Sequence, residues 1–220
     1  MLIEMHTHTS EASPCAHVSA KEMVSLYQNA GYDAVVITDH YCKWVYEQSH
    51  SQTLKEYVDY FLSGYHAARK AAANAPLKIL LGAEVNLTES PNDYLLYGAT
   101  EDFFYQNPEL FTLSLKELYT LCHNNQILLF QAHPYRTYCE PADPVYLDGA
   151  ESYNGNPRHN NQNEKARQWV KDNQLLISSG SDFHEREDLA KGGILTKQPV
   201  ADIQQLCQTL QNSSYTLLTP

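Results

Sequence analysis

Basic residues are scarce in this chain of 220 residues, where 15 Lys and Arg are set against 26 Asp and Glu and the formal net charge is −11. A surface this acidic repels DNA, RNA and anionic lipid, which argues against a polynucleotide partner. An anionic substrate would need a local positive centre, such as bound metal ions, to attract it.

Long hydrophobic runs are also absent. The apolar stretches extend over only a few residues, which is too short to span a membrane. The N-terminus shows no basic segment followed by an apolar one, as a secretory signal would have. We therefore expect a cytoplasmic protein without a membrane partner. No coiled-coil segment indicates an oligomer, so a monomer is the default expectation.

Paired cysteines are missing as well. The five cysteines are an odd number and no two of them form a CxxC motif. This argues against a disulfide framework and against a cysteine-rich structural zinc site. Histidine, in contrast, occurs ten times.

Strand-like and helix-like segments alternate along the chain. The strand-like segments are apolar without alternation, which fits strands buried on both faces of a sheet. Ser/Thr residues followed three positions later by Glu predict three helix starts. This order is typical of an α/β protein with a mostly parallel sheet, and the length favours a single domain over residues 1–220. We expect strands at 2–5, 33–38, 77–85, 94–98, 127–132, 149–154 and 175–180, and helices at about 19–31, 53–75, 114–125, 161–173 and 201–212.

Polar and titratable residues follow the ends of these strands. His6 and His8 are two positions apart behind the first strand, so both can project to the same side. In parallel α/β sheets and barrels the C-terminal strand ends meet on one face, where active sites lie. The residues delivered there are His6, His8, Asp39, His40, Glu84, His133, Asn154, Asp182 and His184.

A mixture of imidazoles and carboxylates suits zinc, manganese or iron, whereas calcium and magnesium prefer oxygen ligands. Seven candidate ligands are too many for one ion, because zinc typically takes about four. We therefore expect two or three divalent ions, bridged by a carboxylate. Glu84 is the natural bridge, since a carboxylate in a nearly apolar strand needs a partner. The seven candidates are His6, His8, His40, Glu84, His133, Asp182 and His184.

Five motifs in order, HTHTSEASPC, VITDHY, GAEV, AHPYR and SGSDFH, resemble the PHP (polymerase and histidinol phosphatase) family over about residues 2–196. The resemblance implies a distorted (β/α)7 TIM-like barrel with two or three metal ions at the strand ends. It also implies phosphoester hydrolysis by a metal-activated water. Carried over, the resemblance assigns His6, His8, Glu84 and Asp182 to one ion, Glu84 and His133 to a second, and His40 and His184 to a third.

The chain departs from the family pattern in one ligand of the third site. The family usually supplies a His or Asp five or six residues after the second histidine of the opening pair, where this chain has Ser13 and Pro14. Three nearby residues are alternatives for the missing ligand: Glu11, Cys15 and His17.

A second departure affects the second site. The family often places a histidine on the strand after the bridging glutamate, but the matching strand here is apolar and Asp93 is only a nearby candidate. A site with fewer ions is therefore an open alternative.

Several polar residues near the motifs have competing interpretations. Asp39 either caps a helix or orients an imidazole. Arg136 and Arg158 either grip a substrate phosphate or form surface ion pairs. Asp182 and His184 can move a proton in addition to binding metal. We interpret the remaining histidines as structural or surface residues, with His159 open to a substrate contact: His50, His66, His123 and His159.

These observations together predict a metal-dependent hydrolase of a small phosphorylated substrate, either a phosphomonoesterase or a phosphodiesterase. One alternative is hydrolysis of an amide-type bond, as in amidohydrolase barrels, which also begin with an HxH strand end. Those barrels usually add a bridging lysine, and no lysine stands at a matching strand end here. The other alternative is a non-catalytic, metal-binding regulatory domain.

Overall fold

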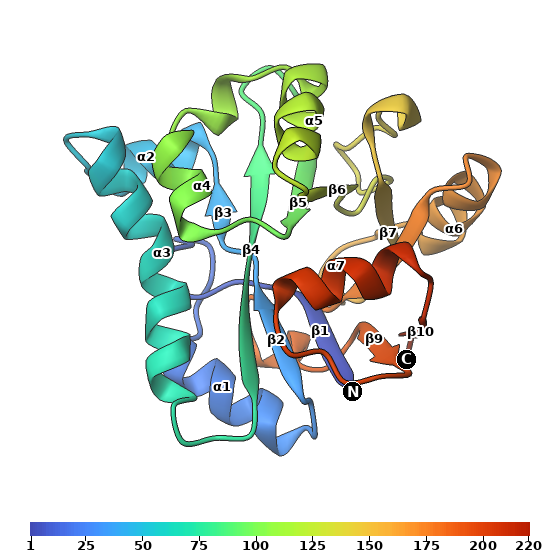
Figure 1. Ribbon diagram of the computed structural model, residues 1–220, viewed down its shortest axis with the longest axis horizontal. Coiled ribbons are helices and arrows are strands. Elements are labelled where there is room, and N and C mark those ends of the chain that lie inside the picture. The colour runs from blue at the N-terminus through green and yellow to red at the C-terminus, as the bar shows by residue number, and fades with distance from the viewer.

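The computed structural model describes residues 1–220 as a mixed α/β fold, in which helices surround a strongly curved, nearly closed sheet (Figure 1). The sheet has ten strands and the chain forms seven α-helices. No helix is long and apolar enough to cross a bilayer. The strands are β1 (Leu2–Thr7), β2 (Ala34–Ile37), β3 (His40–Tyr41), β4 (Lys78–Asn86), β5 (Asp93–Tyr97), β6 (Leu128–Gln131), β7 (Gly149–Asn154), β8 (Leu176–Gly180), β9 (Gly193–Thr196) and β10 (Tyr215–Leu218). The helices are α1 (Ala20–Asn29), α2 (Lys43–Gln48), α3 (Leu54–Ala71), α4 (Glu101–Gln106), α5 (Leu115–Asn124), α6 (Asn163–Asp172) and α7 (Ile203–Gln211).

The sheet runs in the order β10-β9-β1-β2-β4-β5-β6-β7-β8, and β3 pairs with β4 beside this path. The sheet curls so that the segment after its last strand, β8, pairs with the end of β1. There the amide of His8 donates to the carbonyl of Phe183 at 2.9 Å, and the amide of Phe183 donates to the carbonyl of His6 at 3.2 Å. These bonds nearly close the barrel, which confirms the predicted fold class.

The sheet is less parallel than the sequence predicted. β5 is antiparallel to both β4 and β6, and β9 is antiparallel to β1 and β10. The physical reason at β5 is the short connection from Asn86 to Asp93, because a parallel return needs a crossover of about a dozen residues or more.

The predicted helix starts are correct. The side chains of Ser19, Thr53 and Ser114 accept hydrogen bonds from the backbone amides three residues later. Ser114 and Glu117 form a complete, reciprocal capping box. The sequence analysis did not predict five short elements, each of two to six residues: β3, α2, α4, β9 and β10.

Helix α3 packs closely against the loop that follows β1. A Cβ atom on Gly64 would lie 2.1 Å from Thr9 Oγ1 and 2.3 Å from Asp39 Oδ2. Only glycine lets the helix approach this buried pair, so Gly64 fixes the distance between α3 and the loop that carries His8.

Candidate metal centre

The seven predicted ligands meet at one end of the barrel. They come from five strands and the segments that follow them: β1, β3, β4 and the C-terminal ends of β6 and β8. His40 is intermediate in burial, whereas the other six are buried. Contacts shorter than 4 Å link all of them: His6, His8, His40, Glu84, His133, Asp182 and His184.

The hydrogen bonds of His6 and His8 determine which of their ring nitrogens face each other. His6 Nδ1 lies 2.9 Å from Glu151 Oε1, and a carboxylate accepts, so Nδ1 carries the proton. Ser13 Oγ donates to Asp39 at 2.7 Å and therefore accepts from His8 Nδ1 at 3.4 Å. Both Nε2 atoms thus present lone pairs to one another across 3.1 Å. Only a cation between them, a proton or a metal ion, satisfies both.

Two carboxylates complete this arrangement. Asp182 Oδ1 lies 3.4 Å from both Nε2 atoms, and Glu84 Oε1 and Oε2 lie 3.3 Å and 3.2 Å from His6 and His8 Nε2. Ligands bound tetrahedrally to zinc at about 2.0–2.2 Å are separated by about 3.3–3.6 Å. The mutual spacing of His6 Nε2, His8 Nε2 and Asp182 Oδ1 therefore fits three ligands of one tetrahedral ion, and Glu84 lies beside both imidazoles through two different oxygens.

Glu84 stands at the centre of the cluster. Its Oε1 accepts a hydrogen bond from His133 Nε2 at 3.0 Å. Its Oε2 lies 3.0 Å from His40 Nδ1, yet this buried oxygen has no partner in hydrogen-bonding geometry. An unsatisfied carboxylate oxygen at 1 % exposure is costly, and a bound cation would remove the cost.

The electrostatics agree with a site built for positive charge. Burial opposes the charged form of His6, but Glu84, Glu151 and Asp182 outweigh it and hold the His6 pKa well above its usual value. Burial opposes the ionisation of Asp182, but the positive charges of Arg136 and His6 outweigh it and hold the Asp182 pKa well below its usual value. The carboxylates therefore stay ionised and favour a cation among the imidazoles.

Glu151 on β7 is a functional residue that the sequence analysis missed. Its Oε1 accepts from His6 Nδ1, while Oε2 accepts from the amide of His133 and from Asn154 Nδ2, each at 2.9 Å. Carboxylates that orient metal-binding imidazoles in this way are common partners of metal sites. The only sequence signal was one acidic residue in a strand predicted to be buried.

Asp39 orients the loop after β1 and caps no helix, since the N-cap of the following helix α2 is Cys42. Its carboxylate accepts from the amide and hydroxyl of Thr9 and from Ser13 Oγ at 2.7–2.8 Å. Asp39 therefore acts on His8 through Ser13. The predicted orienting role assumed that Asp39 contacts an imidazole directly, whereas Ser13 stands between them.

The three alternatives for the missing third-site ligand lie in different places. Glu11 accepts hydrogen bonds from the amide of Ala20 at the start of α1. His17 is exposed and pairs with Glu185 at 3.2 Å. Cys15 is the one beside a predicted ligand, because its side chain is among the groups that hold the His40 pKa above its usual value.

Three groups of side chains bring their ligand atoms within 4.8 Å of one another. One group belongs to the ion described above, and the second contains His8, His40 and His184. The third adds Asp93 and Cys139 to His133, of which Cys139 was not predicted. His133 and Asp182 also adopt positive φ angles of 27° and 52°, a strained backbone that clusters at functional sites.

The two arginines differ in their surroundings. Arg136 is buried and lies 2.5 Å from Asp182 Oδ2, with further hydrogen bonds to Asn154 and Asn161. Its Nη1 makes no hydrogen bond within the protein. Arg158 is exposed and pairs with Asp188 at 2.8 Å and 3.1 Å.

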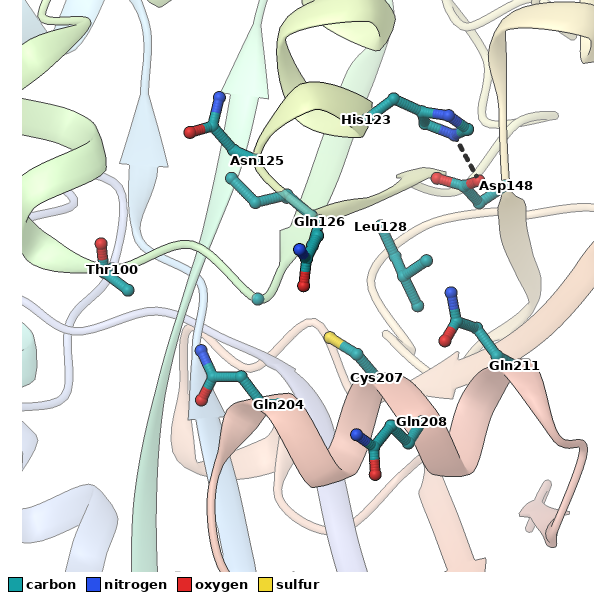
Figure 2. A pocket seen from close by; sticks show the side chains of 12 residues that line it. Thr100, His123, Asn125, Gln126, Leu128, Asp148, Gln204, Cys207, Gln208 and Gln211 are labelled. Carbon is teal, nitrogen blue, oxygen red and sulfur yellow. Dashed lines mark hydrogen bonds and ion pairs between the residues drawn. The ribbon is translucent and has the colours of Figure 1, made fainter.

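Of the histidines interpreted as structural, two pair with residues outside the cluster, whereas His159 lies near enough to Asp182 and Arg136 for their charges to influence its pKa, which burial lowers. His66 and His123 are exposed and pair with Glu101 and Asp148. His123 lines a cavity of 450 Å³ between α7 and the turn that leads into β6, walled mainly by neutral amides (Figure 2). That cavity contains none of the predicted ligands, so it is separate from the metal centre.

The comparisons with known proteins agree with this geometry. The family model described as PHP domain matches residues 4–195. No curated protein matches the chain significantly. Three solved structures share the fold at low sequence identity, as follows.

A two-domain protein from Bacteroides vulgatus, which contains a predicted PHP-like metal-dependent phosphoesterase, superposes with a TM-score of 0.69 at 14% identity, over 100% of this chain and 64% of that one. An amidohydrolase from Chromobacterium violaceum with bound sulfate and no metal superposes with a TM-score of 0.57 at 15% identity, over 99% of this chain and 98% of that one. Endonuclease Q in complex with a 27-mer duplex superposes with a TM-score of 0.63 at 12% identity, over 96% of this chain and 57% of that one. The chain thus spans 64% and 57% of the length of the first and third of these proteins.

The endonuclease shows that this fold accommodates a polynucleotide in another protein, so the expectation that a polynucleotide partner is unlikely is not supported. The family match covers most of the chain and includes every predicted metal ligand. The chain belongs to the PHP domain family.

Proposed function

We propose that this protein is a metal-dependent phosphoesterase that hydrolyses a phosphorylated substrate with water. The observation that carries the proposal is the cluster of His6, His8 and Asp182, whose ligand atoms are spaced for a tetrahedral ion, with Glu84 beside both imidazoles. The two facing Nε2 atoms need a cation between them, and a metal ion supplies it.

The proposal includes two or three divalent ions, with zinc, manganese or iron favoured by the mixed nitrogen and oxygen ligands. His6, His8, Glu84 and Asp182 would hold the first ion. Glu84 and His133 would hold the second, so that Glu84 bridges. His40 and His184 would hold the third, with Cys15 beside His40.

Such ions, when bound, lower the pKa of a water from 15.7 to about 7 and polarise the phosphoryl oxygens. The residues of the chain then act on the proton and the substrate. His184 Nδ1 lies 3.0 Å from the carbonyl of Asp182 and donates to it, which leaves Nε2 to bind an ion or accept a proton. Asp182 and His184 are therefore the residues that we assign to proton transfer.

Arg136 is positioned to orient the phosphate. Three hydrogen-bonding partners, Asp182, Asn154 and Asn161, fix its Nε and Nη2, so the free Nη1 edge is held rigidly beside a metal ligand. A fixed guanidinium recognises phosphate oxygens with little loss of entropy. Arg158 is proposed as a second contact, at the cost of part of its pairing with Asp188.

A small phosphorylated molecule is the proposed substrate, as a phosphomonoester or a phosphodiester. Amide hydrolysis is the rival, since an amidohydrolase shares the fold. The seven-residue cluster contains no lysine that would bridge two ions. A non-catalytic metal-binding domain is the other rival, and only a turnover measurement separates it from an enzyme.

The test combines elemental analysis of the purified protein with a turnover screen of phosphomonoesters, phosphodiesters and amides, with added manganese or zinc. We expect bound metal, and phosphoester hydrolysis that a chelator abolishes. His8→Ala should lose metal and hydrolysis together, whereas the matched control His66→Ala, at an exposed histidine, should keep both. Full hydrolysis by metal-free protein would overturn the proposal.

A further inference from the structure

We propose that Asp188 is a positioning residue, which holds the guanidinium of Arg158 and the backbone of His184 in one arrangement beside the metal centre. The inference rests on the proposed function, because that function assigns Arg158 to the substrate and His184 to a metal ion. Asp188 belongs neither to the sequence motifs nor to the seven-residue ligand cluster. It acts through these two residues rather than on the reacting atoms.

Both carboxylate oxygens of Asp188 accept hydrogen bonds, and the residue is fully buried, at 0% exposure. Its Oδ2 accepts from the backbone amides of His184 and Glu185, each at 2.9 Å. Arg158 donates Nη2 to the same oxygen at 2.8 Å and Nε to Oδ1 at 3.1 Å. Paired charge-assisted hydrogen bonds of this kind fix the geometry of a guanidinium. One buried carboxylate therefore sets the position of both a side chain and a turn.

The two groups that Asp188 joins lie on different segments of the barrel. Arg158 belongs to the segment after β7, whereas His184 belongs to the segment after β8. Asn156 adds a second link, because its Nδ2 donates to the carbonyl of Asp182 and its Oδ1 accepts from the amide of Arg158, each at 2.9 Å. The position of the proposed substrate contact relative to the ligand-bearing segment therefore depends on these bonds.

The pairing leaves one end of the Arg158 guanidinium available to an anion. Nη1 makes no hydrogen bond within the protein, and Glu185 Oε1 lies 3.9 Å from it. While Nε stays bonded to Asp188, the guanidinium keeps its direction as it contacts a phosphate oxygen. A group that is ordered beforehand loses less entropy on binding. Without Asp188 the substrate would have to order Arg158 itself, which would raise KM.

Asp188→Asn separates the two roles of the carboxylate. The new amide oxygen can still accept from the backbone amides of His184 and Glu185, but the amide nitrogen then meets Arg158 Nε, and both groups are donors. Arg158 is released while the turn is kept. Glu187→Gln is the matched control, because this exposed carboxylate lies 3.8 Å from Arg158 Nε and makes no hydrogen bond to it.

NMR of the metal-free, full-length protein measures the pairing without any turnover. The Arg158 Nε–H group should exchange slowly with solvent in wild type and in Glu187→Gln, because Asp188 Oδ1 accepts its hydrogen bond. In Asp188→Asn the same group should exchange fast. Fast exchange already in wild type, or slow exchange that persists in Asp188→Asn, would overturn the positioning role.

Kinetics of the metal-loaded protein with p-nitrophenyl phosphate and its diester measure the consequence. We expect Asp188→Asn to raise KM by about 10-fold or more, the loss typical of a hydrogen bond to a charged group, with kcat and metal affinity retained. Arg158→Gln should raise KM equally, and the double variant should raise it no further. A KM unchanged in Asp188→Asn, or a double variant in which the two effects multiply, would overturn the inference.

The outcomes separate this inference from the proposed function. If wild type hydrolyses neither ester nor any other in the screen, the proposed function fails and the substrate role of Arg158 fails with it, while NMR still decides whether Asp188 holds Arg158. If Asp188→Asn does not fold, Arg158→Lys decides, because lysine keeps the charge but cannot form the paired contact. A KM equal to that of Arg158→Gln would then support the inference, and a KM equal to that of wild type would overturn it.

Discussion

Replacing Gly64 with alanine sets two physical effects against each other. Gly64 lies inside α3, where alanine is normally favoured over glycine by about 0.5–1 kcal/mol. The new methyl group, however, would lie 2.1 Å from Thr9 Oγ1 and 2.3 Å from Asp39 Oδ2. Something in this contact has to move.

Moving Thr9 or Asp39 away from the new methyl group costs free energy, because both are held by hydrogen bonds. The Thr9 hydroxyl donates to Asp39 at 2.8 Å and the Thr9 amide donates to the same carboxylate at 2.7 Å. Overpacking of a core costs about 1–3 kcal/mol, and disturbing a hydrogen bond to a buried charge costs about 1.5–3 kcal/mol. After subtracting the gain in helix propensity from these two costs together, we expect Gly64→Ala to lower the free energy of unfolding by about 1.5–5.5 kcal/mol.

Urea unfolding of the metal-free protein, followed by circular dichroism, measures this change. Ser25→Ala, at an exposed position of α1, is the matched helix control and should change stability by no more than about 0.5 kcal/mol. Because Asp39 positions Ser13 and thereby His8, Gly64→Ala should also weaken metal binding. A more stable Gly64→Ala protein would refute the reasoning, since helix propensity would then outweigh the contact.

Three further predictions follow from contacts described above. Glu151→Gln should weaken metal binding by about 10–100-fold in a competition titration with a chromophoric chelator, because the glutamine no longer provides the charged acceptor for His6 Nδ1. An unchanged metal affinity would exclude a role of Glu151 in orienting His6. Saturating metal at about 100 times its dissociation constant should raise the free energy of unfolding by about 2.7 kcal/mol, and a melting temperature unaffected by chelator would contradict a folded-state site. Ser114→Ala should raise the Glu117 pKa, measured by NMR titration, because the Ser114 hydroxyl and amide hold this pKa below its usual value. The contribution of Glu117 to stability is present above its unfolded pKa and is lost as pH falls, so the stabilities of wild type and variant should converge in acid. An unchanged Glu117 pKa would disprove the capping contribution.

The gathering of the candidate ligands was predictable from sequence because their positions depend on a general property of the fold. Strand ends in an α/β barrel meet on one face, so a histidine or carboxylate directly behind an apolar strand indicates a shared site. His6, Glu84 and His133 stand in such positions, and the structure brings Glu84 within 3.3 Å of His6 and 3.0 Å of His133. Their roles as metal ligands remain a prediction.

Residues whose position depends on a loop or on a neighbouring strand were beyond the same reasoning. Cys139 reaches the cluster through two consecutive turns, and turn geometry is not encoded in strand periodicity. Glu151 points inward from the middle of β7, where a polar residue has no signature until its partner His6 is known. The reversal of β5 was missed because a short strand reads the same in either direction.

The closing contacts of the barrel join segments that are far apart in the sequence. The amide of Ser181 donates to Glu4 across 177 residues of sequence, beside the segment where Phe183 pairs with the end of β1. Asp182 therefore cannot meet His6 and His8 until the segment through Asp182 has left the ribosome. Contacts so distant in sequence slow folding, so a nascent chain would expose His6 and His8 until that point, before any ion could be fully enclosed.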